Sequence, residues 1–160
     1  MLSLNNLNRK ISPNTPYCHD NDMKLWSLGN LLEICARDCK YKKVDLQSFL
    51  HWVKPAILHG QYKLIYTQDN IRCTGFVFWA WVNDDTVYRY LNSNRFILQP
   101  SEWNEGRNLI VVDYCNVTKS LKEIKKLFTT ARKINEHVDS ISYCIRDEAG
   151  IPIKIRKLKK

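Results

Sequence analysis

Apolar residues in the first third of the chain recur at helical spacing. From Met23 onward, leucines and cysteines return every three or four residues as far as Cys39, which predicts an amphipathic helix that the lysine-rich segment 40–43 ends. Asp45 is a favourable N-cap for a second helix, which Pro55 is expected to kink or end. Residues 1–22 are polar and hold two prolines, so we interpret them as an irregular arm before a single domain over residues 23–160.

The pattern changes from helical to extended after Gly60. Residues 61–67 alternate between apolar and polar side chains, and residues 71–82 are almost continuously β-branched and aromatic. These two segments predict a hairpin whose second strand lies inside a sheet. The elements expected after it are a short helix that Asp84 or Asp85 caps, a loop over 92–106, a buried strand over 108–112, a helix over 119–137 and two strands over 140–146 and 151–158.

This order of elements predicts an α/β (α+β) chain in one domain, with a mixed sheet and helices on both faces. It resembles the architecture of the acyl-CoA N-acetyltransferases (GNAT). Architecture by itself does not indicate an activity, because one fold hosts many chemistries.

Length and composition are typical of one packed domain of 160 residues, 44% of them hydrophobic. No segment approaches the ~18 consecutive apolar residues of a spanning helix, so we expect no membrane span. The first ten residues lack the apolar core of a secretory signal, and we therefore expect a cytoplasmic protein. The six cysteines include no Cys-x-x-Cys pair, which favours free thiols over disulfides or zinc ligands.

The formal charge of +9 is concentrated in the last quarter of the chain. Residues 1–118 hold 13 basic and 11 acidic side chains, whereas residues 119–160 hold 12 and 5. A basic region attracts an acidic partner such as a nucleic acid, a lipid surface or an acidic carrier protein, and a merely solvated face is the alternative. Lys122, Lys125 and Lys126 share one face of the helix over 119–137 and are the candidates for docking such a partner. The sequence lacks a strand in which basic and aromatic residues alternate, the pattern typical of an RNA-binding sheet. This absence argues against a nucleic-acid partner.

Asp113 is the first candidate for chemistry. It directly follows the predicted buried strand, and open α/β sheets place their ligands at such strand ends. A helix cap or an ion pair is the structural alternative. The four histidines form no His-x-x-x-His pair, and neither a Gly-x-Ser-x-Gly motif nor a phosphate-binding glycine loop is present. We therefore expect no metal site and no tightly bound cofactor.

The middle of the chain carries an ordered set of short motifs. They are PAILHGQY at 55–62, WA at 79–80, YRYLN at 88–92, the spacing W-x-x-G-x(6)-D from Trp103 to Asp113, and DSISYCIRDEAGIPIKIR at 139–156. This set resembles the toxin-activating lysine acyltransferases of RTX haemolysin systems over roughly residues 29–156. Those proteins look like GNAT folds and transfer a fatty acyl group from acyl carrier protein to lysines of a protoxin in the cytosol.

The resemblance implies roles for two residues. Asp113 matches the family's catalytic aspartate, seven residues after the motif glycine. The family's histidine lies about 14 residues before the proline of its P-A-I segment, and that position is Tyr41 in this sequence. A tyrosine hydroxyl donates or accepts a hydrogen bond but is a poor base at neutral pH, because its pKa is about 10. The family's proline soon after the aspartate is also missing here.

These departures favour a diverged version of the function. Relatives with this fold occur in siderophore-microcin maturation, where an acyltransferase-like subunit and a larger partner join a glucosylated siderophore to the C-terminus of a microcin peptide. In that version, Trp79, Trp103 and Arg107 are expected to contact the acidic, aromatic siderophore. The alternatives are an acyl-carrier-dependent lysine acyltransferase that activates an RTX protoxin, and a non-enzymatic scaffold or basic RNA-binding module.

Overall fold

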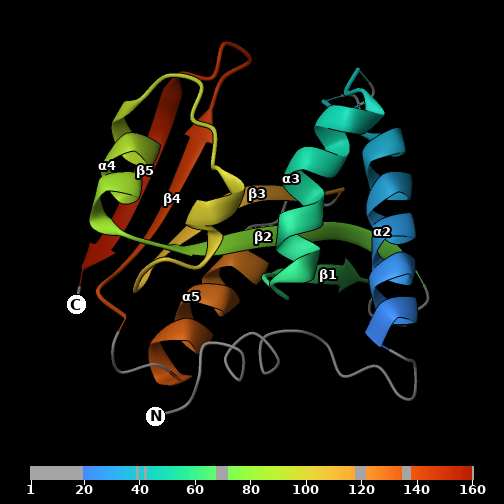
Figure 1. Ribbon diagram of the computed structural model, residues 1–160, viewed down its shortest axis with the longest axis horizontal. Helices are drawn as coiled ribbons and strands as arrows, with labels where there is room; N and C mark the ends of the chain where they lie inside the picture. Colours follow the sequence, from blue (N-terminus) through green and yellow to red (C-terminus); the bar gives the residue numbers. More distant parts are fainter. Residues whose placement is uncertain are drawn as a thin grey trace.

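The computed structural model describes residues 20–38, 40–41, 43–67, 72–117, 122–134 and 138–159 (Figure 1). The helices are α2 (Asp20–Arg37), α3 (Leu46–Leu58), α4 (Asp84–Asn92), the 3-10 helix η1 (Pro100–Trp103) and α5 (Lys122–Ile134). The strands are β1 (Tyr62–Tyr66), β2 (Cys73–Val82), β3 (Asn108–Asn116), β4 (Ser140–Arg146) and β5 (Pro152–Lys159). No helix among these residues is both long and apolar enough to cross a membrane.

The five strands form one mixed sheet in the order β1-β2-β3-β4-β5. Strands β3 and β4 are parallel and the other neighbouring pairs are antiparallel. A parallel pair needs a crossover connection, and α5 lies in the segment that joins β3 to β4. The predicted mixed sheet is confirmed.

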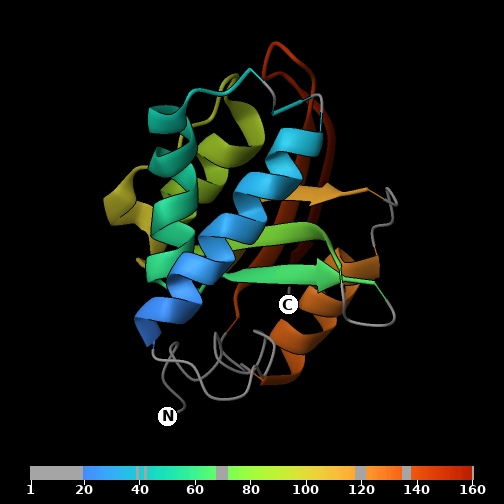
Figure 2. The same ribbon diagram turned by 90° about the vertical axis from the view of Figure 1, so that its right-hand side faces the viewer.

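Helices cover both faces of the sheet, as the element order predicts. On one face lies the first core, which joins the sheet to α2, α3 and α4 and includes Leu31, Val53, Phe76, Tyr90 and Ile110. On the other face lies the second core, which joins the sheet to α5 and includes Trp79, Trp81, Val111, Ile124 and Phe128. Helices α2 and α3 lie side by side over β1 and β2 (Figures 1 and 2).

Several element boundaries differ from the sequence-based expectation; among them, β3 ends at Asn116 and not at residue 112, and the N-cap of α4 is Asn83 and not Asp84 or Asp85. Helix α2 begins at Asp20 and ends at Arg37, so residues 20–22 are helical; residues 1–19 and Cys39 lie outside the described residues. Pro55 does not end α3, which continues to Leu58 because Ala56 and Ile57 are buried in the first core. The predicted loop 92–106 contains η1, which a capping box stabilises.

Candidate active site

A bulge in β3 determines which way Asp113 faces. The sequence places Asp113 just beyond a strand, but β3 continues to Asn116 and Asp113 lies inside it. In the ladder with β2, Asp113 pairs with Phe78 while Val111 pairs with Trp79, so Val112 is an extra residue on β3. A bulge of this kind bends a strand and redirects the side chains that follow.

The burial of neighbouring residues shows the effect of the bulge. A regular strand places residues that are an odd number of positions apart on opposite faces. Ile110 and Cys115 are five positions apart, yet both belong to the first core. Val111 belongs to the second core and Tyr114 packs against it, although the two residues are three positions apart. Because of the extra residue, Asp113 faces the side of the sheet that α2 and α3 cover.

Three donors hold the Asp113 carboxylate on that side. The Tyr41 hydroxyl lies 2.9 Å from both carboxylate oxygens, and Lys40 Nζ lies 3.1 Å from Oδ1. The backbone N–H of Tyr114 also donates to Oδ1, at 2.8 Å. The Asp113 side chain is nevertheless 19% exposed, so part of the carboxylate remains open to a ligand.

Tyr41 is a hydrogen-bond donor in this arrangement. It is buried in the first core, where its ring packs at 5.9 Å from Trp52 and 6.0 Å from Phe76. Burial, and then the negative charge of Asp113, raise the pKa of Tyr41 far above its usual range. The hydroxyl therefore stays protonated at neutral pH and orients Asp113 without acting as a base.

An open groove of about 1010 Å³ passes Asp113. Its wall includes His51 and Trp52 from α3 as well as Ile124 from α5, so residues that cover opposite faces of the sheet line it. The parallel ladder of β3 and β4 has its last pair at Val111 and Tyr143, and the groove uses the space beyond that pair.

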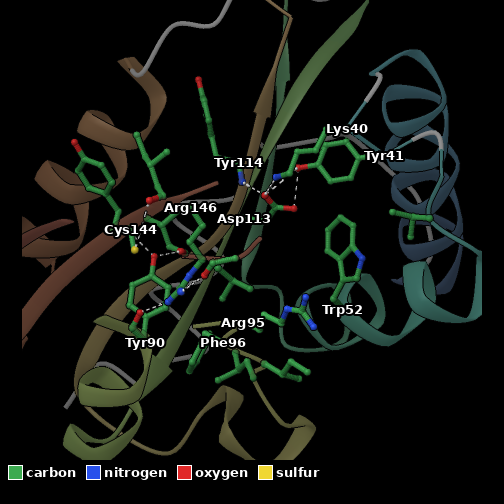
Figure 3. Close-up of a pocket in the computed structure, with 18 of the residues that line it drawn as sticks. Lys40, Tyr41, Trp52, Tyr90, Arg95, Phe96, Asp113, Tyr114, Cys144 and Arg146 are labelled. Carbon is green, nitrogen blue, oxygen red and sulfur yellow. Dashed lines mark hydrogen bonds and ion pairs between the residues drawn. The ribbon is translucent and has the colours of Figure 1, made fainter. Parts of the chain in front are cut away.

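Tyr90 of α4 fills the gap between the separating strands. Its hydroxyl donates to the Val111 carbonyl at 2.6 Å and accepts the Cys144 N–H at 2.7 Å. The Tyr90 hydroxyl thus joins β3 to β4 where the backbone hydrogen bonds between the two strands end. Arg146 lies over the Tyr90 ring at 5.7 Å and donates to the carbonyls of Ser93 and Gly150, which ties β4 to the loop after α4. Figure 3 shows Tyr90 and Arg146 on one side of Asp113, and Lys40 and Tyr41 on the other.

The structure brings together some of the predicted site residues. Asp113 and Tyr41 are in direct contact, and Trp103, at 1% exposure, forms part of the groove wall. Trp79 does not line the groove, because its side chain is fully buried in the second core. Arg107 does not line it either, since it precedes β3 at the end remote from Asp113 and pairs with Asp139 at 3.1 Å.

Sequence reasoning missed most of the groove wall. Trp52, Tyr90, Phe96 and Arg146 line it, and none was a candidate. Tyr90 lies within the YRYLN motif, so the motif was a usable signal for that residue. Lys122, Lys125 and Lys126 are exposed on α5, and their docking role stays a prediction.

The described residues hold no group of three or more His, Cys, Asp or Glu side chains suited to a metal ion. Cys35, Cys73, Cys115 and Cys144 are free thiols. Burial is the largest cause that raises the pKa of Cys35 and of Cys115 to about 12, and Asp113 and Asp38 add to it. These two thiols are therefore protonated at neutral pH and are unsuited to nucleophilic attack.

Comparisons with known proteins place this chain in a family context. The family described as HlyC, RTX toxin acyltransferase family, matches residues 21–144. The uncharacterized protein sll0720 of Synechocystis sp. is 27% identical over 92 residues, which are 58% of this chain and 62% of that protein. This chain thus spans less than two thirds of that relative. The GphF GNAT-like decarboxylase in complex with isobutyryl-CoA superposes with a TM-score of 0.49 and 11% identity, over 81% of this chain and 64% of that one.

Proposed function

The chain belongs to the RTX toxin acyltransferase family, and on that premise we propose that it transfers a fatty acyl group from the thioester of an acyl carrier protein to a lysine of a co-produced toxin. The observation that carries this proposal is the Asp113 carboxylate, which is oriented by Tyr41 and open to the groove. A positioned carboxylate is suited to accept a proton from an attacking amine.

The proposed reaction uses the groove as follows. The lysine amine of the toxin attacks the thioester carbonyl, the C–N bond forms and the C–S bond breaks. Asp113 accepts the proton that the amine loses and passes it to the leaving thiolate, so the carrier leaves as the thiol and the carboxylate is restored. Tyr41 keeps its own proton and fixes the orientation of Asp113. The apolar and aromatic wall, which includes Trp52, Leu98 and Trp103, would limit the access of water to the reacting atoms once the substrates fill the groove.

The acyl carrier protein is the proposed co-substrate, without a tightly bound cofactor. Lys122, Lys125 and Lys126 would attract its acidic surface, since all three are exposed on α5 and Ile124 of the same helix lines the groove. We place the reaction in the cytoplasm, before export of the toxin. Contacts between exposed charges are screened by salt, so the transfer rate should fall steeply as ionic strength rises.

One observation favours a second candidate, the microcin-maturation subunit. The groove combines aromatic side chains, such as Trp52 and Phe96, with the cations Lys40 and Arg95. This combination suits an anionic aromatic ligand such as a catecholate siderophore. In this version a larger partner subunit would activate the peptide carboxylate, and this chain would hold the siderophore conjugate beside Asp113.

Metabolic labelling of the native host tests the proposal. Cells that express either the wild-type chain or Asp113→Asn are fed an alkynyl fatty acid, and labelled proteins are identified by mass spectrometry. We expect a secreted toxin whose label is on a lysine, survives hydroxylamine and disappears in Asp113→Asn. An Asp113-dependent siderophore–peptide conjugate would favour the second candidate. Identical products in both strains would contradict both candidates and leave the scaffold alternative.

A further inference from the structure

A lysine of this chain already occupies the place of an acceptor amine. Lys40 Nζ lies 3.1 Å from Asp113 Oδ1 and 2.9 Å from the Tyr41 hydroxyl oxygen, to which it donates. In the proposed reaction the acceptor must bring the same functional group, a primary amine on a flexible stem, to hydrogen-bond distance of the same carboxylate. The Lys40 side chain is 65% exposed and lines the groove.

The backbone that carries Lys40 is held in place. The Asp38 carboxylate accepts the Lys40 backbone N–H at 2.8 Å, and the Asp38 carbonyl accepts the Tyr41 N–H at 3.1 Å. Cys115 of β3 donates its thiol hydrogen to the Asp38 carboxylate at 3.4 Å, which ties this turn to the sheet beside Asp113. The fold therefore presents Lys40 to Asp113 even when no substrate is bound.

The contact that holds the amine itself is weak. The ion pair between Lys40 and Asp113 contributes little to stability, because the Lys40 side chain is 65% exposed and water and salt screen the interaction. Nζ is thus free to leave Asp113 for a carbonyl carbon in the groove, and the long side chain gives it the reach.

We propose that Lys40 is an acyl-acceptor site and that the chain acylates its own Lys40 when a thioester donor is bound and no protein substrate is present. This inference rests on the proposed acyltransferase function. The amine nitrogen of Lys40 attacks the thioester carbonyl, the N–C bond forms and the C–S bond breaks. Lys40 first gives one ammonium proton to Asp113 and becomes a neutral amine. The second proton, which the nitrogen loses as the amide forms, passes to the thiolate of the carrier, which leaves as the thiol, and Asp113 then releases its proton to solvent.

The product has a physical consequence for the site. An amide carries no charge, so the acylated Lys40 no longer pairs with Asp113. Its acyl chain remains in the groove and competes with the next acceptor. Acylation of Lys40 therefore inactivates the chain, and an abundant protein substrate protects it.

Peptide mapping after a reaction in vitro tests the inference. The full chain is incubated with acyl carrier protein that bears an alkynyl-palmitoyl thioester, and labelled lysines are located by mass spectrometry. We expect label at Lys40, at a rate about 100-fold lower in Asp113→Asn. Lys40→Arg keeps the positive charge and should abolish the label, whereas the matched control Lys43→Arg, an exposed lysine in the same turn, should leave it unchanged.

The acceptor protein that metabolic labelling identifies is assayed in a parallel reaction. Label on that acceptor but none on Lys40 would overturn the self-acylation inference and leave the proposed function intact. Label on neither protein would overturn both. Label spread over many surface lysines, equal in the wild type and Asp113→Asn, would indicate uncatalysed chemical acylation and would also overturn the inference.

Discussion

Replacing Tyr90 by phenylalanine tests whether one hydroxyl joins the two strands that separate at the groove. The change keeps the ring in the first core and removes the oxygen that bonds to the Val111 carbonyl at 2.6 Å and the Cys144 N–H at 2.7 Å. Tyr90 is 2% exposed and Val111 5% exposed, so water replaces these bonds poorly. An unsatisfied buried polar group costs about 1–3 kcal/mol. The buried Val111 carbonyl bears this cost in full and the part-buried Cys144 N–H only in part, so we expect a loss of about 2–4 kcal/mol.

Urea denaturation of the wild type and Tyr90→Phe measures this loss as a shift of the midpoint at constant slope. The corresponding fall in Tm is about 4–16 °C, since each kcal/mol lowers the Tm of a domain of this size by about 2–4 °C. Tyr88→Phe is the matched control, because Tyr88 lies on the same helix, is 70% exposed and should change stability by less than ~0.5 kcal/mol. A loss below about 1 kcal/mol for Tyr90→Phe would refute the bridging role of the hydroxyl.

Three further predictions concern the site and its supports. Tyr41→His restores the family pattern and should increase the acyl-transfer rate about tenfold, with a new limb near pH ~6.5 in the pH–rate profile; an unchanged profile would show that a histidine at position 41 takes no part in the proton transfer. Cys35 and Cys115 have folded-state pKa values of about 12 against 9.0 for the ordinary thiol, so their contribution to stability is present below pH 9 and is lost as the pH rises toward 12. Between about pH 8 and 9.5 the wild type should lose ~1.5 kcal/mol more than the Cys35→Ala/Cys115→Ala variant in urea unfolding, and equal losses would argue against the raised pKa values. A Cβ at Gly106 would lie 2.2 Å from a β2 carbonyl oxygen, so Gly106→Ala should destabilise the fold by about 3 kcal/mol, whereas Gly29→Ala, with nothing within 4 Å, should not destabilise it.

The pattern of apolar residues predicted the order of α2, α3, α4, α5 and the five strands, but not η1. Residues 71–82 are so uniformly apolar that only an interior strand fits them, and β2 indeed pairs with a strand on each side. The motif glycine at position 106 has a local physical reason, since only a residue without a Cβ fits against β2 there. The interior position of β2 depends on the apolar composition of its own segment, so the sequence predicts it, whereas the reason for Gly106 is a contact with Val82 that only the fold shows.

The parts that could not be predicted depend on tertiary contacts. Nothing in the segment Val111–Asp113 marks Val112 as a bulge, yet that extra residue decides which face Asp113 takes. Alternation places Trp79 and Trp81 on a common face of a strand but does not say whether that face meets a groove or α5. The sequence suggests Arg107 as a ligand-binding cation, but in the fold it pairs with Asp139, which is more than thirty residues away along the chain.

The acyl-transfer rate of Asp113→Asn is the most direct test of the central claim. The substitution keeps the size of the side chain and removes its ability to accept a proton as a carboxylate. The measurement is single-turnover transfer from alkynyl-palmitoyl acyl carrier protein to the acceptor found by metabolic labelling, with circular dichroism to verify that the variant is folded. The account predicts a rate reduced by about 10²–10⁴-fold, the usual contribution of a general base. A folded variant that transfers at a rate within about threefold of the wild type would contradict it.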